Sequence, residues 1–122
     1  MADDTKYRDI ISVTLVDGNR SQLFSIDRDF QLWTMYMTYP LPIANWTEWA
    51  KFPLPGKSGG VIKIAGTPGK TFLQPGVGNQ YWYPRIWAVD TDNDLWSCEG
   101  ILNTGGKLWS DWSPWVAPYP NN

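Results

Sequence analysis

The segment Arg85-Ile-Trp-Ala-Val-Asp-Thr-Asp-Asn-Asp-Leu-Trp96 has a counterpart earlier in the chain, in residues 22–33. Residues 22–53 can be laid over residues 85–116 without a gap, and pairs between the anchors such as Leu23/Ile86, Phe24/Trp87 and Thr47/Ser110 keep their chemical type. The anchoring pairs are Asp27/Asp90, Asp29/Asp92, Leu32/Leu95, Trp33/Trp96, Trp46/Trp109 and Trp49/Trp112. Chance does not place tryptophans in such a register. An internal repeat of this size is typical of propellers, solenoids and arrays.

The length of 122 residues is that of a single domain, so we expect one domain over residues 1–122. The first repeat unit covers about residues 10–56 and the second about residues 61–119. The second unit contains an insertion, residues 66–84, where the first has only a short turn. Insertions in repeat proteins form loops on one face, and this is often the binding face.

The composition excludes several classes of function. The net charge of −2 argues against nucleic acid, because a surface that neutralises phosphates normally shows an excess of basic residues. The chain has no histidine, and its one cysteine, Cys98, leaves no intrachain disulfide, so imidazole catalysis and His- or Cys-based metal sites are excluded. We expect no cofactor, no membrane insertion, and a cytoplasmic protein or one released without a signal peptide.

The hydrophobic pattern predicts an all-β chain. Short runs of β-branched and aromatic residues alternate with turn residues, and no helical period or capping box appears. Proline and glycine in residues 53–60 indicate a connector between the units. We expect two four-stranded antiparallel units, with strands at residues 10–16, 22–26, 31–37 and 46–52, and at 61–65, 85–90, 94–99 and 109–115.

The repeated phrase resembles the blades of the Psathyrella velutina and Photorhabdus lectin-type β-propellers. It consists of a hydrophobic strand ending in Asp, a polar turn, Leu-Trp, a variable loop, and Trp-Ser/Thr-acid-Trp. The likeness spans about half of the chain, and its matching stretches are residues 23–27, 32–33 and 46–49, and again residues 86–90, 95–96 and 109–112. Family blades usually have Asp-Gly at the central turn, whereas this chain has Arg28-Asp29 and Thr91-Asp92.

Two blades cannot close a propeller, which needs roughly four to eight. A blade without neighbours exposes apolar faces, so we expect a homo-oligomer that completes the ring. Dimers, trimers and tetramers would give four, six or eight blades. Resemblance to the two-blade fucose-binding lectins of soil bacteria favours the six-bladed trimer. The alternative is that the two units pair within one chain as a small sandwich.

The tryptophans of the last strand in each unit are the leading candidates for a ligand site. Indole faces suit the apolar C–H face of a sugar ring, and neighbouring carboxylates accept hydrogen bonds from hydroxyl groups. Trp33 and Trp96 are expected to be mainly structural. One tryptophan of each last-strand pair is expected to pack and the other to be freer. The candidate residues are Trp46, Glu48, Trp49, Trp109, Asp111 and Trp112, with Arg28, Arg85, Asn45 and Tyr36 adding polar contacts and Trp82 in the insertion.

Each candidate has a plainer alternative. Aromatic residues fill the space between propeller sheets, and the cluster Tyr81-Trp82-Tyr83 would serve equally as a plug or an intersubunit contact. Glycoside hydrolysis needs two carboxylates about 5–9.5 Å apart, and the spacing of Glu48 and Asp111 does not demand it. Residues 90–94 lack the glycine and glutamate of a calcium loop.

The sequence therefore predicts a non-catalytic, multivalent carbohydrate-binding lectin whose partners are glycans. The alternative is an interaction or structural module in which the tryptophans are buried and no sugar is bound. An enzyme subunit is the third possibility.

Overall fold

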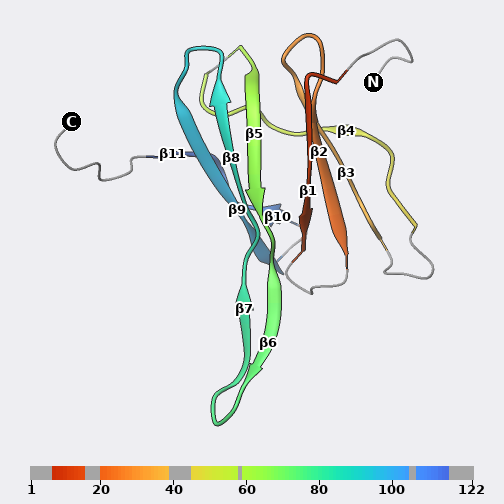
Figure 1. Cartoon of the computed structure of the whole chain (residues 1–122), viewed down its shortest axis with the longest axis vertical. Helices are drawn as coiled ribbons and strands as arrows, with labels where there is room; N and C mark the ends of the chain where they lie inside the picture. Colours follow the sequence, from red (N-terminus) through yellow and green to blue (C-terminus); the bar gives the residue numbers. More distant parts are fainter. Residues whose placement is uncertain (1–6, 16–19, 39–44, 58, 105–106, 116–122) are drawn as a thin grey trace, which may run out of the picture.

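The computed structural model describes residues 7–15, 20–38, 45–57, 59–104 and 107–115, and only the backbone of residues 101–104 and 107–108. All the regular secondary structure among these residues is β-strand (Figure 1). The prediction of an all-β chain is confirmed. No helix in the described part of the chain is long and apolar enough to cross a membrane.

The first sheet is an antiparallel meander in which each strand pairs with the next along the chain. The first three predicted strands are found with bounds that differ by a few residues, and the fourth is found only in part. The strands are β1 (Asp9–Thr14), β2 (Ser21–Ile26), β3 (Leu32–Tyr36) and β4 (Ala50–Lys51).

The second sheet repeats this meander in the order β5, β8, β9 and β10, with β11 pairing with another part of β9. Strand β9 is longer than the predicted strand at residues 94–99, since it continues to Thr104. The strands are β5 (Val61–Thr67), β8 (Arg85–Asp90), β9 (Leu95–Thr104), β10 (Lys107–Trp109) and β11 (Ser113–Pro114).

The repeat extends to the register of the strands. Trp33 pairs with Lys51 in the first sheet, and their counterparts in the repeat, Trp96 and Pro114, pair in the second. Trp46 forms an isolated bridge with Met37, just as Trp109 pairs with Gly100. Two stretches that match in sequence have therefore folded to the same pairing.

The last strand of each unit was predicted to be continuous, and this prediction was wrong. In the first unit it is reduced to the bridge at Trp46 and the two residues of β4, and in the second it is split into β10 and β11. The hydroxyl oxygen of Thr47 accepts a hydrogen bond from the Tyr36 amide, 3.0 Å away, and the Ser110 hydroxyl accepts one from the Glu99 amide, also 3.0 Å away. The repeated Thr/Ser therefore uses its side chain where the strand leaves the regular ladder.

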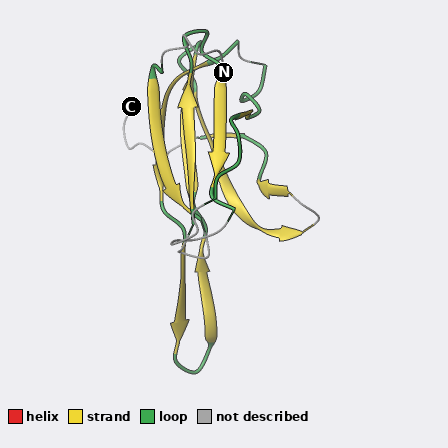
Figure 2. Cartoon of the chain, turned by 90° about the vertical axis from the view of Figure 1, so that its right-hand side faces the viewer, coloured by secondary structure: helices red, strands yellow, loops and turns green. Residues whose placement is uncertain are grey.

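The insertion at residues 66–84 was predicted to be a loop, and this prediction was also wrong. Residues 66–67 end β5, and β6 (Lys70–Gln74) and β7 (Gly78–Trp82) form a two-stranded antiparallel hairpin. The sequence has the signal for it, since Pro75-Gly76 suits a tight turn, Gly76 has a φ of 80° and the Val77 amide donates to the Gln74 carbonyl. The hairpin extends well beyond the ends of the two larger sheets (Figures 1 and 2).

The aspartate turns between the second and third strands of the two units adopt the same structure. One oxygen of Asp27 accepts hydrogen bonds from the amides of Asp29 and Gln31, and the other accepts one from the Trp33 indole, 2.7 Å away. Asp90 makes the same three contacts with Asp92, Asp94 and Trp96. Burial raises the pKa of Asp27 and Asp90, but these donors outweigh it, and the pKa of each carboxyl is below its usual value.

The blades that the chain resembles usually have Asp-Gly at this turn, whereas here a residue other than glycine adopts the positive φ. The positive φ falls at Phe30 (64°) and at its counterpart Asn93 (67°), one residue after Asp29 and Asp92. The guanidinium of Arg8 lies 4.1 Å from the centre of the Phe30 ring, and the Phe30 carbonyl accepts from the Val61 amide. An unfavourable backbone conformation is thus held by contacts on both sides of the residue.

The two sheets pack face to face, and their edges meet where β1 lies beside β5 (Figure 1). A Cβ atom on Gly66 would lie 2.6 Å from Val13 Cγ1, so the absence of a side chain allows this close approach. The shared core contains Val13, Phe24, Ile26, Leu32, Val61, Ile64, Ile86, Ala88, Cys98 and Trp109.

The two sheets contribute opposite faces to this core. Side chains alternate along a strand, and the first sheet uses Gln22, Phe24 and Ile26, whereas the second uses Ile86 and Ala88. The repeat aligns Ile86 with Leu23, which lies on the other face of the first sheet. The two units therefore stack in the same orientation, front to back, and each leaves one face without a neighbouring sheet among the described residues.

Candidate functional site

A cleft of about 550 Å³ lies between the two sheets, and we call it the inter-sheet cleft. It is lined by both sheets and by the connector that joins them. Four of the predicted site residues are among its walls, so the structure brings together Tyr36, Trp109, Asp111 and Trp112. The full lining is Gln22, Thr34, Tyr36, Phe52, Pro53, Leu54, Gly56, Trp109, Ser110, Asp111 and Trp112.

Aromatic rings form one wall of the cleft in a chain of edge-to-face contacts. Trp109 is only 6% exposed and meets Phe24 with ring centres 5.2 Å apart at 90°. Phe52 lies between the two tryptophans, with its ring centre 6.2 Å from that of Trp109 and 6.0 Å from that of Trp112. The Trp112 indole donates a hydrogen bond of 2.7 Å to the Pro53 carbonyl. Both tryptophans are thus fixed in orientation.

A relay of hydrogen bonds joins side chains that line the cleft. The Trp109 indole donates to Gln22 Oε1 at 2.9 Å, and Gln22 Nε2 donates to the Thr34 hydroxyl at 2.8 Å. Thr34 in turn donates to the Leu23 carbonyl at 2.8 Å. The relay joins the two sheets through side chains and satisfies the polar atoms that the packing buries.

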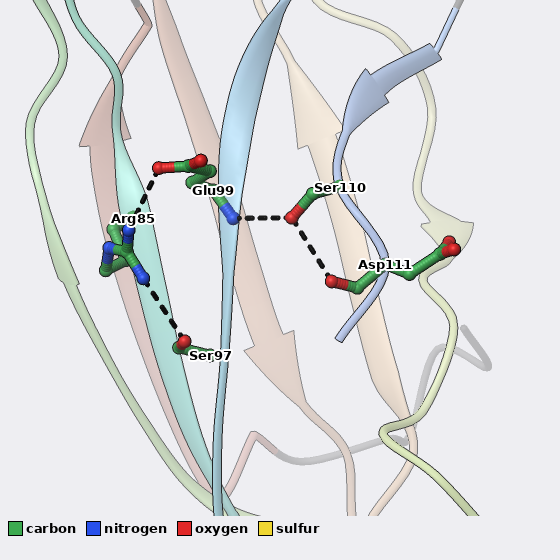
Figure 3. Close-up of polar contacts among 5 residues, drawn as sticks. All are labelled: Arg85, Ser97, Glu99, Ser110 and Asp111. Atoms are coloured by element: carbon green, nitrogen blue, oxygen red, sulfur yellow. Dashed lines mark hydrogen bonds and ion pairs between the residues drawn. The ribbon is translucent and has the colours of Figure 1, made fainter. Parts of the chain in front are cut away.

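The rim of the cleft carries the more accessible polar groups. Asp111 is exposed and Tyr36 and Ser110 are half-buried. The Ser110 hydroxyl accepts from the Glu99 amide and donates to the Asp111 carbonyl at 3.2 Å, which fixes the backbone that carries Asp111 (Figure 3). The Asp111 carboxylate points away from Glu99 and Arg85 (Figure 3). The cleft thus combines rigid indoles with an acceptor at its mouth.

A second arrangement lies on the opposite face of the second sheet, which we call the outer face. Arg85 donates to Glu99 Oε2 at 2.9 Å and to the Ser97 hydroxyl at 3.3 Å (Figure 3). Its guanidinium carbon lies 5.5 Å from the ring centre of Trp115 and 6.0 Å from that of Trp87. The two rings meet edge to face, 5.8 Å apart at 88°. An ion pair is therefore framed by two indoles.

The outer face is the repeat counterpart of the first-sheet wall of the inter-sheet cleft. The alignment of the repeat relates Gln22 to Arg85 and Phe24 to Trp87, and it also relates Thr34/Ser97, Tyr36/Glu99 and Phe52/Trp115. Even the hydrogen bonds correspond, because Arg85 donates to Ser97 as Gln22 donates to Thr34. The neutral residues Gln22 and Tyr36 of the first sheet are replaced in the second by Arg85 and Glu99, which form an ion pair.

The counterparts of Trp109 and Trp112 lie at the far side of the first sheet. Trp46 is 39% exposed, and Trp49 is half-buried against Tyr7, with ring centres 6.0 Å apart. Glu48 is exposed beside them. In the second unit the expected contrast is found, since Trp109 is buried and Trp112 is half-buried. In the first unit neither tryptophan is fully buried.

Arg28, Trp82 and Asn45 also lie away from both arrangements. Arg28 is exposed in the first aspartate turn, where its carbonyl accepts a hydrogen bond from Arg8 Nε. Trp82 is 62% exposed on the hairpin, against Phe72. Asn45 contributes its carbonyl to Thr38. None of these three lines the inter-sheet cleft.

Sequence reasoning missed four polar residues of these walls, namely Gln22, Thr34, Ser97 and Glu99. The repeat held a signal for them, because the pairs Gln22/Arg85 and Thr34/Ser97 are polar positions inside otherwise apolar strands. Their partners across the sheet depend on strand register, which composition does not reveal.

Trp33, Trp96 and Cys98 have structural surroundings. The indoles of Trp33 and Trp96 are tied to the aspartate turns, as described above. Cys98 is 2% exposed in the core, and burial raises the pKa of its thiol to about 12. Among the residues that the structure describes, no three acidic, histidine or cysteine side chains are grouped to hold a metal ion.

A scan against protein-family models and searches of curated proteins and of solved structures found no match to this chain. The case for a function therefore rests on the geometry of the two arrangements.

Proposed function

We propose that the chain is a non-catalytic, multivalent carbohydrate-binding protein whose sugars bind in clefts between neighbouring sheets. The observation that carries this proposal is the inter-sheet cleft, where Trp109 and Trp112 stand beside Tyr36 and Asp111. A concave site with apolar walls and a few placed polar groups suits a small ligand. A sugar ring presents an apolar C–H face to an indole and hydroxyl groups to a carboxylate.

The proposal includes assembly of the chain into a closed ring of propeller blades, with a trimer of six blades favoured. The front-to-back stacking of the two sheets supports it, because the same contact can be repeated between chains. The first sheet's free face, with Trp46, would cover the outer face of the next copy as Trp109 covers Phe24. Such a heterologous contact produces a ring when its rotation closes.

Ring closure would create a second kind of cleft between copies. The residues equivalent in the repeat to the lining of the inter-sheet cleft would line this second cleft. They are Arg85, Ser97, Glu99 and Trp115 of one copy and Trp46, Thr47, Glu48 and Trp49 of the next. The cleft within a chain is neutral on its first-sheet side, whereas this one carries an ion pair. Several sites on one ring would increase avidity without any new contact.

A structural role for the aromatic residues is the competing function, and one observation favours it. Trp109 is buried and its indole is already bonded to Gln22, so it would be just as well placed in a cleft that binds nothing. Trp112 and Asp111 distinguish the two functions, because both lie nearer the rim.

The test is binding of the purified protein to a panel of monosaccharides and to a glycan array, with the sugar analysed afterwards for turnover. We expect binding without turnover, and a loss of about tenfold or more in affinity in Trp112→Ala and Asp111→Asn. Asp92→Asn is the matched control, because it removes an exposed carboxylate from a turn outside the cleft. Retained binding in both cleft variants, or no binding to any sugar, would contradict the proposal.

A further inference from the structure

The hairpin β6–β7 exposes apolar side chains that nothing in the proposed sugar site uses. Leu73 is 71% exposed, Val77 63%, Trp82 62% and Tyr81 41%. The hairpin pairs with neither of the larger sheets. Because an isolated two-stranded hairpin is only marginally stable in water, a persistent arm of this kind calls for a partner.

The apolar residues lie on both faces of the hairpin. Directly paired residues share a face, and the register pairs Lys70 with Trp82, Thr71 with Tyr81 and Leu73 with Asn79. One face therefore carries Phe72 and Trp82, whose ring centres lie 5.3 Å apart. The opposite face carries Leu73 and Tyr81. A single flat partner would cover only one of these faces.

The position of the hairpin indicates what lies on its two sides. It continues β5 and β8 lengthwise, past the end of both sheets (Figures 1 and 2). Strand β5 is the edge strand of the second sheet, and it lies beside the edge strand β1 of the first sheet, where the two sheets converge. The Gly69 amide donates to the Thr14 carbonyl at 2.6 Å, which ties the base of the hairpin to β1.

In a ring of such sheets, the converging edges β1 and β5 surround the central axis. Each copy would then send one hairpin along this axis, beyond one end of the ring. Cyclic symmetry with three or more copies gives every hairpin a neighbour on each side, and those two neighbours present different faces. The two apolar faces of β6–β7 match that requirement.

We propose that the hairpins of neighbouring copies pack against each other around the ring axis, with the Phe72–Trp82 face of one against the Leu73–Tyr81 face of the next. This rests on the ring of the proposed function. Charge does not oppose it, because Lys70 is the only charged side chain from residue 70 to residue 84. The packed hairpins would close one end of the central opening of the ring and hold the copies together.

Paired cysteines test this contact. Leu73→Cys and Gln80→Cys lie on opposite faces of one hairpin, so they cannot join within it but would face each other between neighbours. We expect mild oxidation of the double variant to give covalent trimers on a denaturing gel, and each single variant to give none. The native Cys98 is buried in the core and does not interfere. Asp92→Cys combined with Lys57→Cys, two exposed sites on the body, is the control for random collisions.

Solution mass, measured on the same samples before oxidation, separates the two proposals. Covalent trimers in the double variant alone support the packed hairpins. A trimeric mass without covalent trimers leaves the ring intact and overturns the hairpin contact, assigning the arm to another partner. A monomeric mass without cross-links overturns both the ring and the hairpin contact.

Discussion

Trp109 and Trp46 occupy the same position of the repeat, yet Trp109 is 6% exposed and Trp46 is 39% exposed. Trp109 lies against Phe24 and bonds to Gln22 of the neighbouring sheet. Trp46 has no sheet on its side within the described residues. The corresponding receiving surface, around Trp87 and Trp115, is on the outer face of the same chain. If the same contact forms once within a chain and once between chains, a single copy would bury Trp109 and leave Trp46 exposed, which is the difference observed.

The two tryptophans should therefore respond differently to removal. We expect Trp46→Ala to dissociate from trimer to monomer at a higher protein concentration than the wild type, with an unchanged circular dichroism spectrum, because the sheet contact proposed between copies is weakened while the hairpin contact remains. Trp109→Ala should instead destabilise the chain itself by about 3–5 kcal/mol, the usual cost of removing a large buried aromatic residue. Light scattering gives the mass, and denaturant unfolding gives the stability.

A dilution series in which Trp46→Ala dissociates at the same concentration as the wild type, or a wild-type protein that is monomeric at all concentrations, would show that this surface is not a contact between copies. Ile62→Ala is a suitable control for the mass measurement, because Ile62 is 43% exposed on β5 and is not part of either tryptophan's surroundings.

The repeat made the two inner strands of each sheet predictable, namely β2 and β3 and their counterparts β8 and β9, because each of their positions had a second copy against which to check the pattern. Trp33/Trp96 and the aspartate turns could be predicted for the same reason. The faces of the sheets were harder. Whether a given tryptophan is covered depends on which sheet lies beside it, and Trp46 and Trp109 have the same local sequence in different surroundings. The hairpin was missed because it has no counterpart in the first unit.

The aspartate turns should make stability depend on pH. The pKa of Asp27 and of Asp90 is lowered in the folded state, so the stabilisation is complete above the unfolded value of about 3.9 and is lost as the pH falls through the folded value. We expect the free energy of unfolding to fall as the pH is lowered below about 5. Asp27→Asn, which removes the ionised acceptor, should flatten this dependence.

At neutral pH, Asp27→Ala should cost about 1.5–3 kcal/mol, because a buried carboxylate that accepts three hydrogen bonds is removed. Asp29→Ala is the matched control. Asp29 is exposed and is an anchor of the repeat in sequence, yet its change should fall within about 0.5 kcal/mol. Equal losses in the two variants would contradict the assignment of the turn to Asp27.

The Cys98 thiol should be unreactive in the native protein. Its burial raises the pKa to about 12, so almost no thiolate is present at pH 8, and the surrounding core excludes reagent. We expect a thiol reagent to label less than about a tenth of native protein in the time that it fully labels protein unfolded in denaturant. Rapid labelling at low denaturant would instead reveal local opening of β9.

Among the polar residues of the two arrangements, the sequence supplied Tyr36, Asp111 and Arg85 but not Gln22, Thr34, Ser97 and Glu99. Gln22 and Arg85 were readable as polar positions, but their roles follow from what they face. Gln22 meets an indole from the other sheet of its own chain, and Arg85 meets Glu99 and two aromatic rings. Both environments are assembled by residues distant in the sequence, so they follow from strand register and sheet packing rather than from local pattern.

The inter-sheet cleft and the cleft proposed between copies, which would carry the Arg85–Glu99 ion pair, should behave as two classes of binding site. In Arg85→Gln the outer face gains the residue that its counterpart has in the first sheet, and Glu99 loses its ionic partner. We expect calorimetry to give two sugars per chain for the wild type and one for Arg85→Gln, with the trimeric mass unchanged. Arg28→Gln, which removes the same charge from an exposed turn, should retain both classes. If Arg85→Gln weakens all sites equally, or leaves the stoichiometry unchanged, the two clefts are not separate sites, and the assignment of the second cleft to the contact between copies is wrong.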